Sequence, residues 1–446
     1  MNRIIRMLGV DKAIRYVIFG KVISVLTGLL LILLISHYLS KDTQGYYYTF
    51  NSVVALQIIF ELGLSTVIIQ FASHEMSALK YDFSGKNIIG ESLNKQRYLS
   101  LFQLAIKWYA AIALLIILVV GPAGYVFFTQ ENDLGVQWQG AWLLLTIATA
   151  FNIFLVSVLS IAEGTGLVAD VNKMRMYQAL LAGILAVSLL VCGLGLYATS
   201  AIAVSGIIIF SIFSYKYFKN IFYQSFKCKN DRADGGISWV HEIFPMQWRI
   251  ALSWMSGYFI YFVMTPIAFK YFGAAYAGQL GMSLTLCNMV MATGLAWIST
   301  KYPRWGVMVS NKQQAELSQS FKNAVLQSTF FVLAGLVGVY ISLWILKLSG
   351  SNLGDRFLEL QDFFFLSVAI IGNHLVACGA TYIRAYKTEK MTLASCIMAV
   401  LTITTMWFVA YSGNSRFYML MYALLTWGYF VPQTYIIFKR FKSSYE

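Results

Sequence analysis

The stretch "YVIFGKVISVLTGLLLILLIS" (residues 16–36) contains a single charged residue, Lys21. A helix of about 20 apolar residues crosses the ~30 Å hydrocarbon layer of a bilayer, so this stretch predicts a membrane-spanning helix. The rest of the chain has the same character: 59% of its 446 residues are hydrophobic, 12% are charged, and the mean hydropathy is +0.66. Because soluble domains carry about 25% charged residues, this composition excludes a water-soluble protein.

Apolar runs of spanning length recur along the whole sequence. They are long and unbroken, without the alternation of a β-barrel strand, and therefore favour helices. The twelve predicted spans are 14–37, 45–70, 103–128, 140–162, 176–197, 199–218, 250–271, 279–300, 324–347, 361–383, 391–411 and 416–438. The predicted fold class is an all-α integral membrane protein with 12 transmembrane helices.

Basic residues orient these helices, because cytoplasmic loops are enriched in Lys and Arg. With the N-terminus in the cytoplasm, 27 of the 33 basic residues fall in cytoplasmic segments and five in external ones; Lys21 lies within a span. Both termini are therefore predicted to be cytoplasmic. The net charge of +14 is explained by anionic lipid headgroups, so nucleic acid need not be a partner.

The longest polar connection divides the chain into two halves. We expect an N-terminal six-helix lobe at 1–220, a cytoplasmic linker at 221–249 and a C-terminal six-helix lobe at 250–446. A shift of 233 residues places Tyr38 over Tyr271 and Gly45 over Gly278, a weak internal repeat. Six helices in each half predict parallel repeats about an axis along the membrane normal, with a central cavity between the lobes.

Motifs for covalent chemistry are missing from the sequence. The five cysteines lack metal-site spacing, and there is no P-loop, nucleotide fingerprint or HExxH motif. External loops are too short for a catalytic domain. The sequence therefore predicts a protein that is not an enzyme and has neither a metal nor a cofactor.

Two opposite charges lie inside the first two spans. Lys21 and Glu61, in "FELGLSTVIIQ" (60–70), are about 7 and 5 Å to the cytoplasmic side of their helix centres at 1.5 Å per residue. One intramembrane charge costs at least roughly 2.5–3.5 kcal/mol, which pairing or access to water would reduce. Two readings remain open. The pair could fix one helix against the other, or Lys21 could bind a diphosphate while Glu61 orients it or exchanges with substrate.

Other polar side chains lie within spans or at their ends, and each has a structural alternative. Arg249 and Arg384 could reach a substrate diphosphate or anchor in headgroups, and Asn152 and Asn288 could contact sugar or link helices. Asn373 and His374, near the centre of a span, are candidates for ion or proton coupling, or for an interhelical hydrogen bond. These candidates for substrate binding and coupling are Lys21, Glu61, Arg249, Arg384, Asn152, Asn288, Asn373 and His374.

Three segments resemble a known family. They are "LLLILLISHYLSKDTQGYYYTFNSVVALQIIFELGL" (30–64), "FPMQWRIALSWMSGYFIYFVMTPIAFKYFGAAYAGQLGMSL" (244–284) and "WISTKYPRW" (297–305). The sequence resembles the lipid-linked oligosaccharide flippases of bacterial O-antigen and capsule assembly. These form the polysaccharide-transporter branch of the multidrug/oligosaccharidyl-lipid/polysaccharide exporter superfamily.

The resemblance implies alternating access by two lobes around a cationic cavity. It implies a flippase that moves an undecaprenyl-diphosphate-linked oligosaccharide to the periplasmic leaflet of the bacterial inner membrane, in lipopolysaccharide biosynthesis. A polysaccharide polymerase and a chain-length regulator are further implied partners. Two departures stand out. The Arg-Asp pair that lipid II flippases carry in the first helix is not seen, and Lys21 stands in the helix where drug exporters carry an acidic residue.

Three other functions fit the sequence less well. A cation-coupled multidrug exporter on the same fold would need an acidic rather than a basic cavity. A membrane-embedded polysaccharide polymerase or ligase would need a large external loop with catalytic residues. A scaffold protein would gain nothing from isolated intramembrane charges.

The charge distribution predicts the topology directly. Reporter fusions placed after Gln44 and after Arg356 should report an external location, because both positions lie in segments poor in basic residues. A cytoplasmic signal at either fusion would contradict the predicted orientation.

Overall fold

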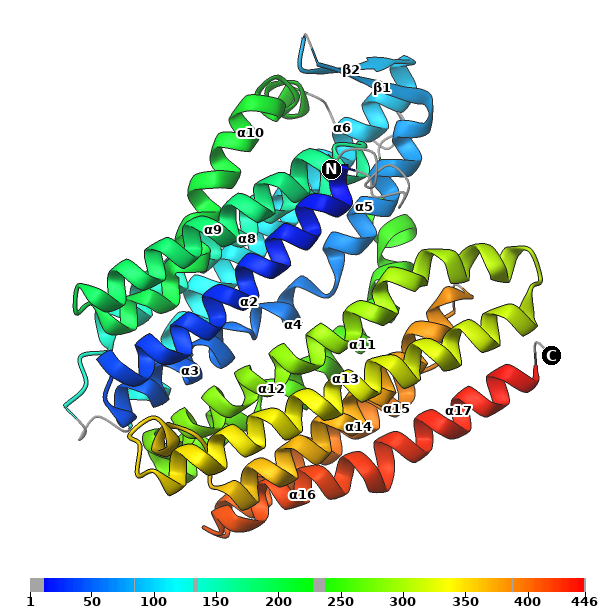
Figure 1. The fold of residues 1–446 in the computed structure, drawn as a ribbon. Helices are drawn as coiled ribbons and strands as arrows, with labels where there is room; N and C mark the ends of the chain where they lie inside the picture. The colour runs from blue at the N-terminus through cyan, green and yellow to red at the C-terminus, as the bar shows by residue number, and fades with distance from the viewer. Residues whose placement is uncertain (1–11, 84, 131–134, 228–236, 387, 445–446) are drawn as a thin grey trace, which may run out of the picture. The chain divides into compact units, whose positions relative to one another are not determined.

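The computed structural model describes residues 12–83, 85–130, 135–227, 237–386 and 388–444, which are almost entirely helical (Figure 1). Within these residues nine helices are long and apolar enough to cross a membrane, or ten if a bent pair is one span. The prediction of an all-α membrane protein is confirmed. Each of the twelve predicted spans falls on a helix or on consecutive helices.

The difference between nine or ten helices and twelve has two sources. The stretch Ile250–Ser310 counts as one helix, yet at 1.5 Å per residue it would be about 90 Å long. Gly273, with φ 86°, breaks it between two predicted spans. The last predicted span forms two helices joined by a π-helical turn at Thr426–Phe430, and does not count among the nine.

The chain forms two compact units, described here one at a time. Unit 1 comprises Met1–Tyr38 and Val53–Trp254; unit 2 comprises Leu39–Ser52 and Met255–Glu446. The division lies close to the predicted linker at 221–249, but Leu39–Ser52 belongs to unit 2 although the sequence placed it in the first half. The predicted central cavity stays a prediction.

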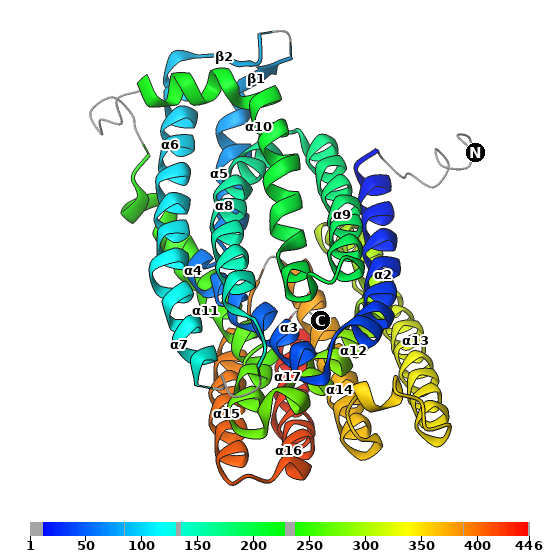
Figure 2. The ribbon, with the colours of Figure 1, turned by 90° about the vertical axis from the view of Figure 1, so that its left-hand side faces the viewer.

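Unit 1 is a layered helix bundle. Its complete helices are α2 (Lys12–Tyr38), α4 (Gln57–Glu61), α5 (Leu64–Glu75), α6 (Ser92–Leu115), α7 (Gly121–Thr129), α8 (Gln139–Gly164), α9 (Val168–Val191) and α10 (Ala201–Lys227). α2 packs against α9, α9 against α10, and α10 against α8, while α8 also packs against α5 and α6 (Figure 2). The core contains large buried rings such as Phe128, Trp138 and Trp142.

A β-hairpin joins α5 to α6 at one end of unit 1 (Figure 2). Strands β1 (Leu79–Asp82) and β2 (Asn87–Gly90) pair antiparallel, with Lys80 opposite Ile89. They form the only sheet in the described part of the chain. The sequence analysis predicted only a long cytoplasmic connection here, because the strands are too short to show clear alternation.

The second predicted span is broken rather than continuous. It consists of α3 (Lys41–Val54), α4 and α5, with a bend of 41° at the junction between α4 and α5. Leu62 and Gly63 both have positive φ values, 53° and 65°. A Cβ on Gly63 would lie 2.5 Å from Ile250 Cγ2, so both the backbone angle and the packing require glycine.

Unit 2 contains most of α3 and the C-terminal helices. These are α12 (Met264–Ser310), α13 (Gln314–Leu348), α14 (Leu360–Ala385), α15 (Thr392–Tyr411), α16 (Tyr418–Leu425) and α17 (Val431–Ser443). α11 (Phe244–Tyr261) crosses from unit 1 into unit 2. α14 is the central helix, packing against α12, α13, α16 and α17.

The N-terminal part of α3 packs tightly against α12. A Cβ on Gly45 would lie 2.0 Å from the Ala274 carbonyl oxygen, and one on Gly278 would lie 2.8 Å from the Gly45 nitrogen. Such small residues allow helix backbones to approach closely in a membrane. The Gln44 amide, 1% exposed, donates to the Gly278 carbonyl at 2.9 Å and to the Arg356 carbonyl at 3.0 Å. Gln44 was expected in an external loop; it lies inside α3 and is buried.

Gly45→Ala should lower the thermal stability of the protein, whereas Gly257→Ala should not. The added methyl at Gly45 has no room beside Ala274, and overpacking of this kind costs about 1–3 kcal/mol. Gly257 is also helical but has open space around its Cβ position, so alanine there should be neutral or mildly stabilising. Thermal unfolding of both variants in detergent measures the difference. Equal midpoints would contradict the close packing.

Candidate functional site

Lys21 lies on the exposed side of α2 and has no ion-pair partner among the described residues. The predicted pairing with Glu61 is wrong. The reason is the packing of α2, whose main neighbour is α9: Gly20 faces Met176, with its Cβ position 3.6 Å from the Met176 Cα. Lys21 is therefore an unpaired cation in the middle of an apolar helix.

Glu61 is the last residue of α4, next to the helix break at Leu62 and Gly63. Its Oε1 accepts a hydrogen bond from the Tyr109 hydroxyl at 3.1 Å. Because a helix end leaves backbone carbonyls without intrahelical donors, broken spans commonly provide sites for coupling ions or protons. The carboxylate has the chemistry to bind a cation or a proton, and coupling stays a prediction for this residue.

Asn373 and His374 lie in the core of unit 2, and both side chains are 0% exposed. The Asn373 amide donates to the Tyr422 hydroxyl at 2.9 Å, and Tyr422 in turn donates to the Ile260 carbonyl at 3.3 Å. His374 Nε2 lies 3.1 Å from the Ser328 hydroxyl, which donates to the Gly294 carbonyl at 2.7 Å. The two residues therefore link α14 to four other helical segments.

Several buried polar atoms in these clusters have no hydrogen-bond partner. They are Asn373 Oδ1 and His374 Nδ1 in unit 2, and Asn152 Oδ1 in unit 1. Asn152 is on α8 beside Gly206 of α10, where a Cβ would lie 2.0 Å from Asn152 Oδ1. Because an unpaired buried polar atom is costly, these positions have capacity to bind a proton, a water or a polar ligand group.

The other predicted residues are scattered. Asn288 is exposed on α12. Arg384, at the end of α14, is paired with Glu389 at 2.7 Å between Nε and Oε2. Arg249 belongs to α11, and its side chain lies outside the described residues. Among the described side chains no hydrogen bond or ion pair joins two of the predicted site residues, and their binding roles stay predictions.

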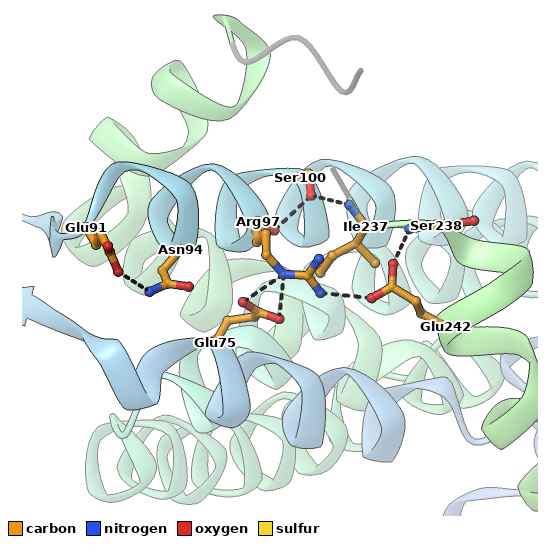
Figure 3. Close-up of polar contacts among 8 residues, drawn as sticks. All are labelled: Glu75, Glu91, Asn94, Arg97, Ser100, Ile237, Ser238 and Glu242. Atoms are coloured by element: carbon orange, nitrogen blue, oxygen red, sulfur yellow. Dashed lines mark hydrogen bonds and ion pairs between the residues drawn. The ribbon is translucent and has the colours of Figure 1, made fainter. Parts of the chain in front are cut away.

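The sequence analysis missed the strongest ionic cluster in unit 1 (Figure 3). Arg97 Nε lies 3.2 Å from both carboxylate oxygens of Glu75, and Arg97 Nη2 lies 2.8 Å from Glu242 Oε2. Glu75 is only 7% exposed. The contact between Arg97 and Glu242 joins residues 145 positions apart, so local sequence patterns do not indicate the cluster.

The same cluster attaches the chain before α11 to α6. The Ile237 backbone N–H donates to the Ser100 hydroxyl at 3.1 Å, and the Ser238 N–H donates to Glu242 Oε1 at 2.8 Å (Figure 3). Burial opposes ionisation of Glu242, but the Ser238 N–H and Arg97 outweigh it and hold the pKa of Glu242 below its ordinary value of 4.5. Arg97 thus joins α5, α6 and the connection that leads into α11.

The arrangement can bind charged and polar groups. Among the described residues, no group of three or more His, Cys, Asp or Glu side chains comes together to hold a metal ion.

Solved structures with the same fold are transporters. The chain superposes on an inward-facing multidrug resistance MATE family transporter of the MOP superfamily with a TM-score of 0.69, 12% identity and coverage of 98% of this chain and 99% of that one. It also matches the MATE multidrug transporter DinF-BH in complex with R6G (TM-score 0.61, 12% identity, 95% and 93% covered). A third match is a MOP superfamily transporter from Pyrococcus furiosus, described as having a binding pocket of reverse polarity (TM-score 0.58, 11% identity, 97% and 96% covered).

These likenesses establish the fold, over nearly the full length of the chain. No protein-family model and no curated protein matches the sequence.

Arg97→Met should destabilise unit 1 by about 1–3 kcal/mol. It leaves Glu75 buried without a partner, but Arg97 and Glu242 retain contact with water, so the cost falls below the 3–5 kcal/mol of a fully buried pair. Arg175→Met is the control, because its pair with Glu163, also at 2.8 Å, is more exposed on the arginine side. Chemical denaturation of both variants in detergent measures the two losses.

The pH dependence of this cluster has a defined sign. Since the folded pKa of Glu242 is lowered, its contribution to stability is present above the ordinary value of 4.5 and is lost as the pH falls through the folded pKa. Glu242→Gln should remove that acid-sensitive contribution. The free energy of unfolding of the wild type and of Glu242→Gln is compared as the pH falls below 4.5. An equal loss of stability in the two proteins would contradict the role of Glu242.

Proposed function

We propose that this chain is an alternating-access flippase that moves an undecaprenyl-diphosphate-linked oligosaccharide repeat unit from the cytoplasmic to the periplasmic leaflet. The observation that carries the proposal is Lys21, an exposed and unpaired cation within the apolar helix Arg15–Tyr38. An intramembrane charge of this kind costs several kcal/mol unless water or a ligand compensates it. A diphosphate is a ligand that a lysine binds well as a point charge.

The transporter class is supported by the shared fold and by the internal repeat. Residues 45 and 278, equivalent under the shift of 233 positions, touch each other. The next equivalent pair, Tyr48 and Gly281, also touches: a Cβ on Gly281 would lie 2.3 Å from the Tyr48 Cβ. Both contacts lie within unit 2, where they bring together parts of the chain that the repeat relates.

The anionic substrate is supported by the sign of the available charge. Lys21 is unpaired, whereas the acidic candidate in the second span, Glu61, is already bonded to Tyr109. The Pyrococcus furiosus transporter is described as having a binding pocket of reverse polarity, which suggests a different function for that protein. We assign the diphosphate to Lys21, with Arg249 and Arg384 as secondary phosphate contacts and Asn152 and Asn288 as sugar contacts.

Coupling and cellular context complete the proposal. Glu61, at the helix break, and the Asn373–His374 cluster, with its unpaired buried atoms, have the chemistry for proton coupling. The membrane would be the bacterial inner membrane with both termini cytoplasmic, and the pathway O-antigen or lipopolysaccharide assembly. A polysaccharide polymerase and a chain-length regulator would act on the flipped product.

The second candidate is a cation-coupled multidrug exporter. Two of the solved structures cited above are described as multidrug transporters. A carboxylate at a helix break, Glu61, could serve an exporter of organic cations equally well. The two functions are separated by the charge of the transported molecule.

The experiment reconstitutes the full chain in proteoliposomes and offers two substrates in turn. One is a fluorescent polyprenyl-diphosphate-linked saccharide, whose transfer between leaflets is measured by its exposure to a membrane-impermeant quencher. The other is the dye R6G, whose export is followed directly. We expect transfer of the diphosphate lipid and none of R6G. Export of R6G without lipid transfer would overturn the flippase proposal.

Lys21→Ala should slow transfer of the diphosphate lipid by about 10- to 100-fold, because a hydrogen bond to a charged group contributes about 1.5–3 kcal/mol. Lys390→Ala is the matched control, since it removes an exposed lysine outside the helices. Membrane abundance should be normal for both variants because Lys21 has no structural ion pair. Wild-type transfer by Lys21→Ala would remove Lys21 from the substrate site.

A further inference from the structure

The last turns of α10 form an amphipathic surface at one end of unit 1. In Figure 2 they run across the ends of the bundle beside the hairpin, whereas the earlier turns of α10 run along it. Figure 1 shows the same turns nearly end-on, so the views agree on the change of direction. We name the exposed side chains here the α10 interfacial face, which consists of Tyr215, Lys216, Lys219, Tyr223 and Phe226.

The hairpin holds these turns in place through three hydrogen bonds. The Tyr81 hydroxyl donates to the Tyr217 carbonyl at 2.7 Å, the Asn220 amide to the Gly85 carbonyl at 2.8 Å, and the Gln224 amide to Asn87 Oδ1 at 2.9 Å. A carbonyl engaged by a side chain in this way is a recognised cause of helix bending. The direction of the last turns is therefore fixed by unit 1 itself.

The opposite side of these turns is the packed side. Phe218 and Ile221 are 0% exposed, and Phe218 stacks on Phe102 of α6 with ring centroids 6.0 Å apart. On the exposed side Tyr215, Lys219 and Phe226 follow each other at spacings of four and seven, which places them on one stripe of a helix. Phe226 is 68% exposed.

We propose that the α10 interfacial face lies in the headgroup layer of the membrane and binds anionic phospholipid. The candidate span Gly195–Phe226 is 32 residues long, whereas about 20 residues suffice to cross the hydrocarbon layer, so the last turns can lie beyond that layer. Tyrosine rings are typical of that boundary, and lysines next to it bind anionic headgroups. Lys219 Nζ lies 5.0 Å from the centroid of the Tyr215 ring, so the lysine and the aromatic ring act at the same level.

The charge of the face favours an anionic partner, such as lipid phosphate, over a neutral or basic one. Within residues 215–226 there are two lysines and no acidic residue. The exposed aromatic rings of this face would be unfavourable in water, whereas burial beside the acyl chains stabilises them. The membrane that α10 spans is therefore the anionic surface that this face would contact.

The test places a fluorophore on Phe226→Cys in a chain whose five native cysteines are replaced, reconstituted in nanodiscs. Nitroxides attached to the lipid headgroup or deep in the acyl chain then report its depth by quenching. We expect the strongest quenching by the headgroup nitroxide. Ile208→Cys, exposed on the spanning part of the same helix, is the control and should be quenched most by the deep nitroxide.

The lipid dependence tests the charge. Lys216→Gln/Lys219→Gln should lower headgroup quenching at residue 226 in nanodiscs containing phosphatidylglycerol. Each lysine contributes about 1 kcal/mol near an anionic surface, so each substitution should lower the equilibrium constant for membrane contact of this face by about fivefold. In phosphatidylcholine alone the two proteins should be alike. The control Lys312→Gln/Lys322→Gln removes two exposed lysines of the turn before α13 and of α13, and should behave as the parent.

A fluorophore at residue 226 quenched by aqueous iodide and by neither nitroxide would overturn the proposal. It would show that α10 continues into water and leaves the face to a soluble partner. Equal headgroup quenching of parent and Lys216→Gln/Lys219→Gln in phosphatidylglycerol would overturn the role of the lysines. Neither result depends on the transported substrate.

Discussion

Inside a bilayer, every backbone N–H and C=O group must find its hydrogen-bond partner within the protein. That constraint explains why the chain is helical almost throughout, and it makes each departure from helix informative. The departures in unit 1 include the break at Leu62 and Gly63, which is accommodated by two left-handed residues. In unit 2 Gly273 kinks α12 in a similar way, with a single positive φ value and helix on both sides of it.

The same constraint explains how polar side chains are used. The Gln44 side chain bonds two backbone carbonyls in unit 2, and Tyr422 and Ser328 each bond another. These bonds link helices that apolar packing alone would hold only weakly, since lipid tails compete equally for apolar surface. Lys21 is the exception, because no ion pair compensates its charge among the described residues of unit 1.

Hydrophobic patterning sufficed to predict an all-α membrane protein, in which every predicted span falls on helical structure. It could not predict side-chain partners. The expected Lys21–Glu61 pair assumed that consecutive spans pack together, whereas α2 packs against α9, which lies more than a hundred residues further along the chain. The Arg97 cluster was missed for the same reason, because Glu242 approaches Arg97 only in three dimensions. The glycine pair at 45 and 278 was visible as a repeat, but its direct contact was not.

The assignment of Leu39–Ser52 to unit 2 has a consequence for biosynthesis. This segment is made early, yet the residues it packs against, Ala274 and Gly278, are about 230 positions later in the chain. At 5–20 residues per second, the ribosome needs roughly 10–50 s to reach them. During that interval the Gln44 side chain has none of the carbonyl partners described above, and it must be shielded in the insertion machinery or at the membrane surface. Assembly of unit 2 therefore begins only after most of unit 1 has been translated.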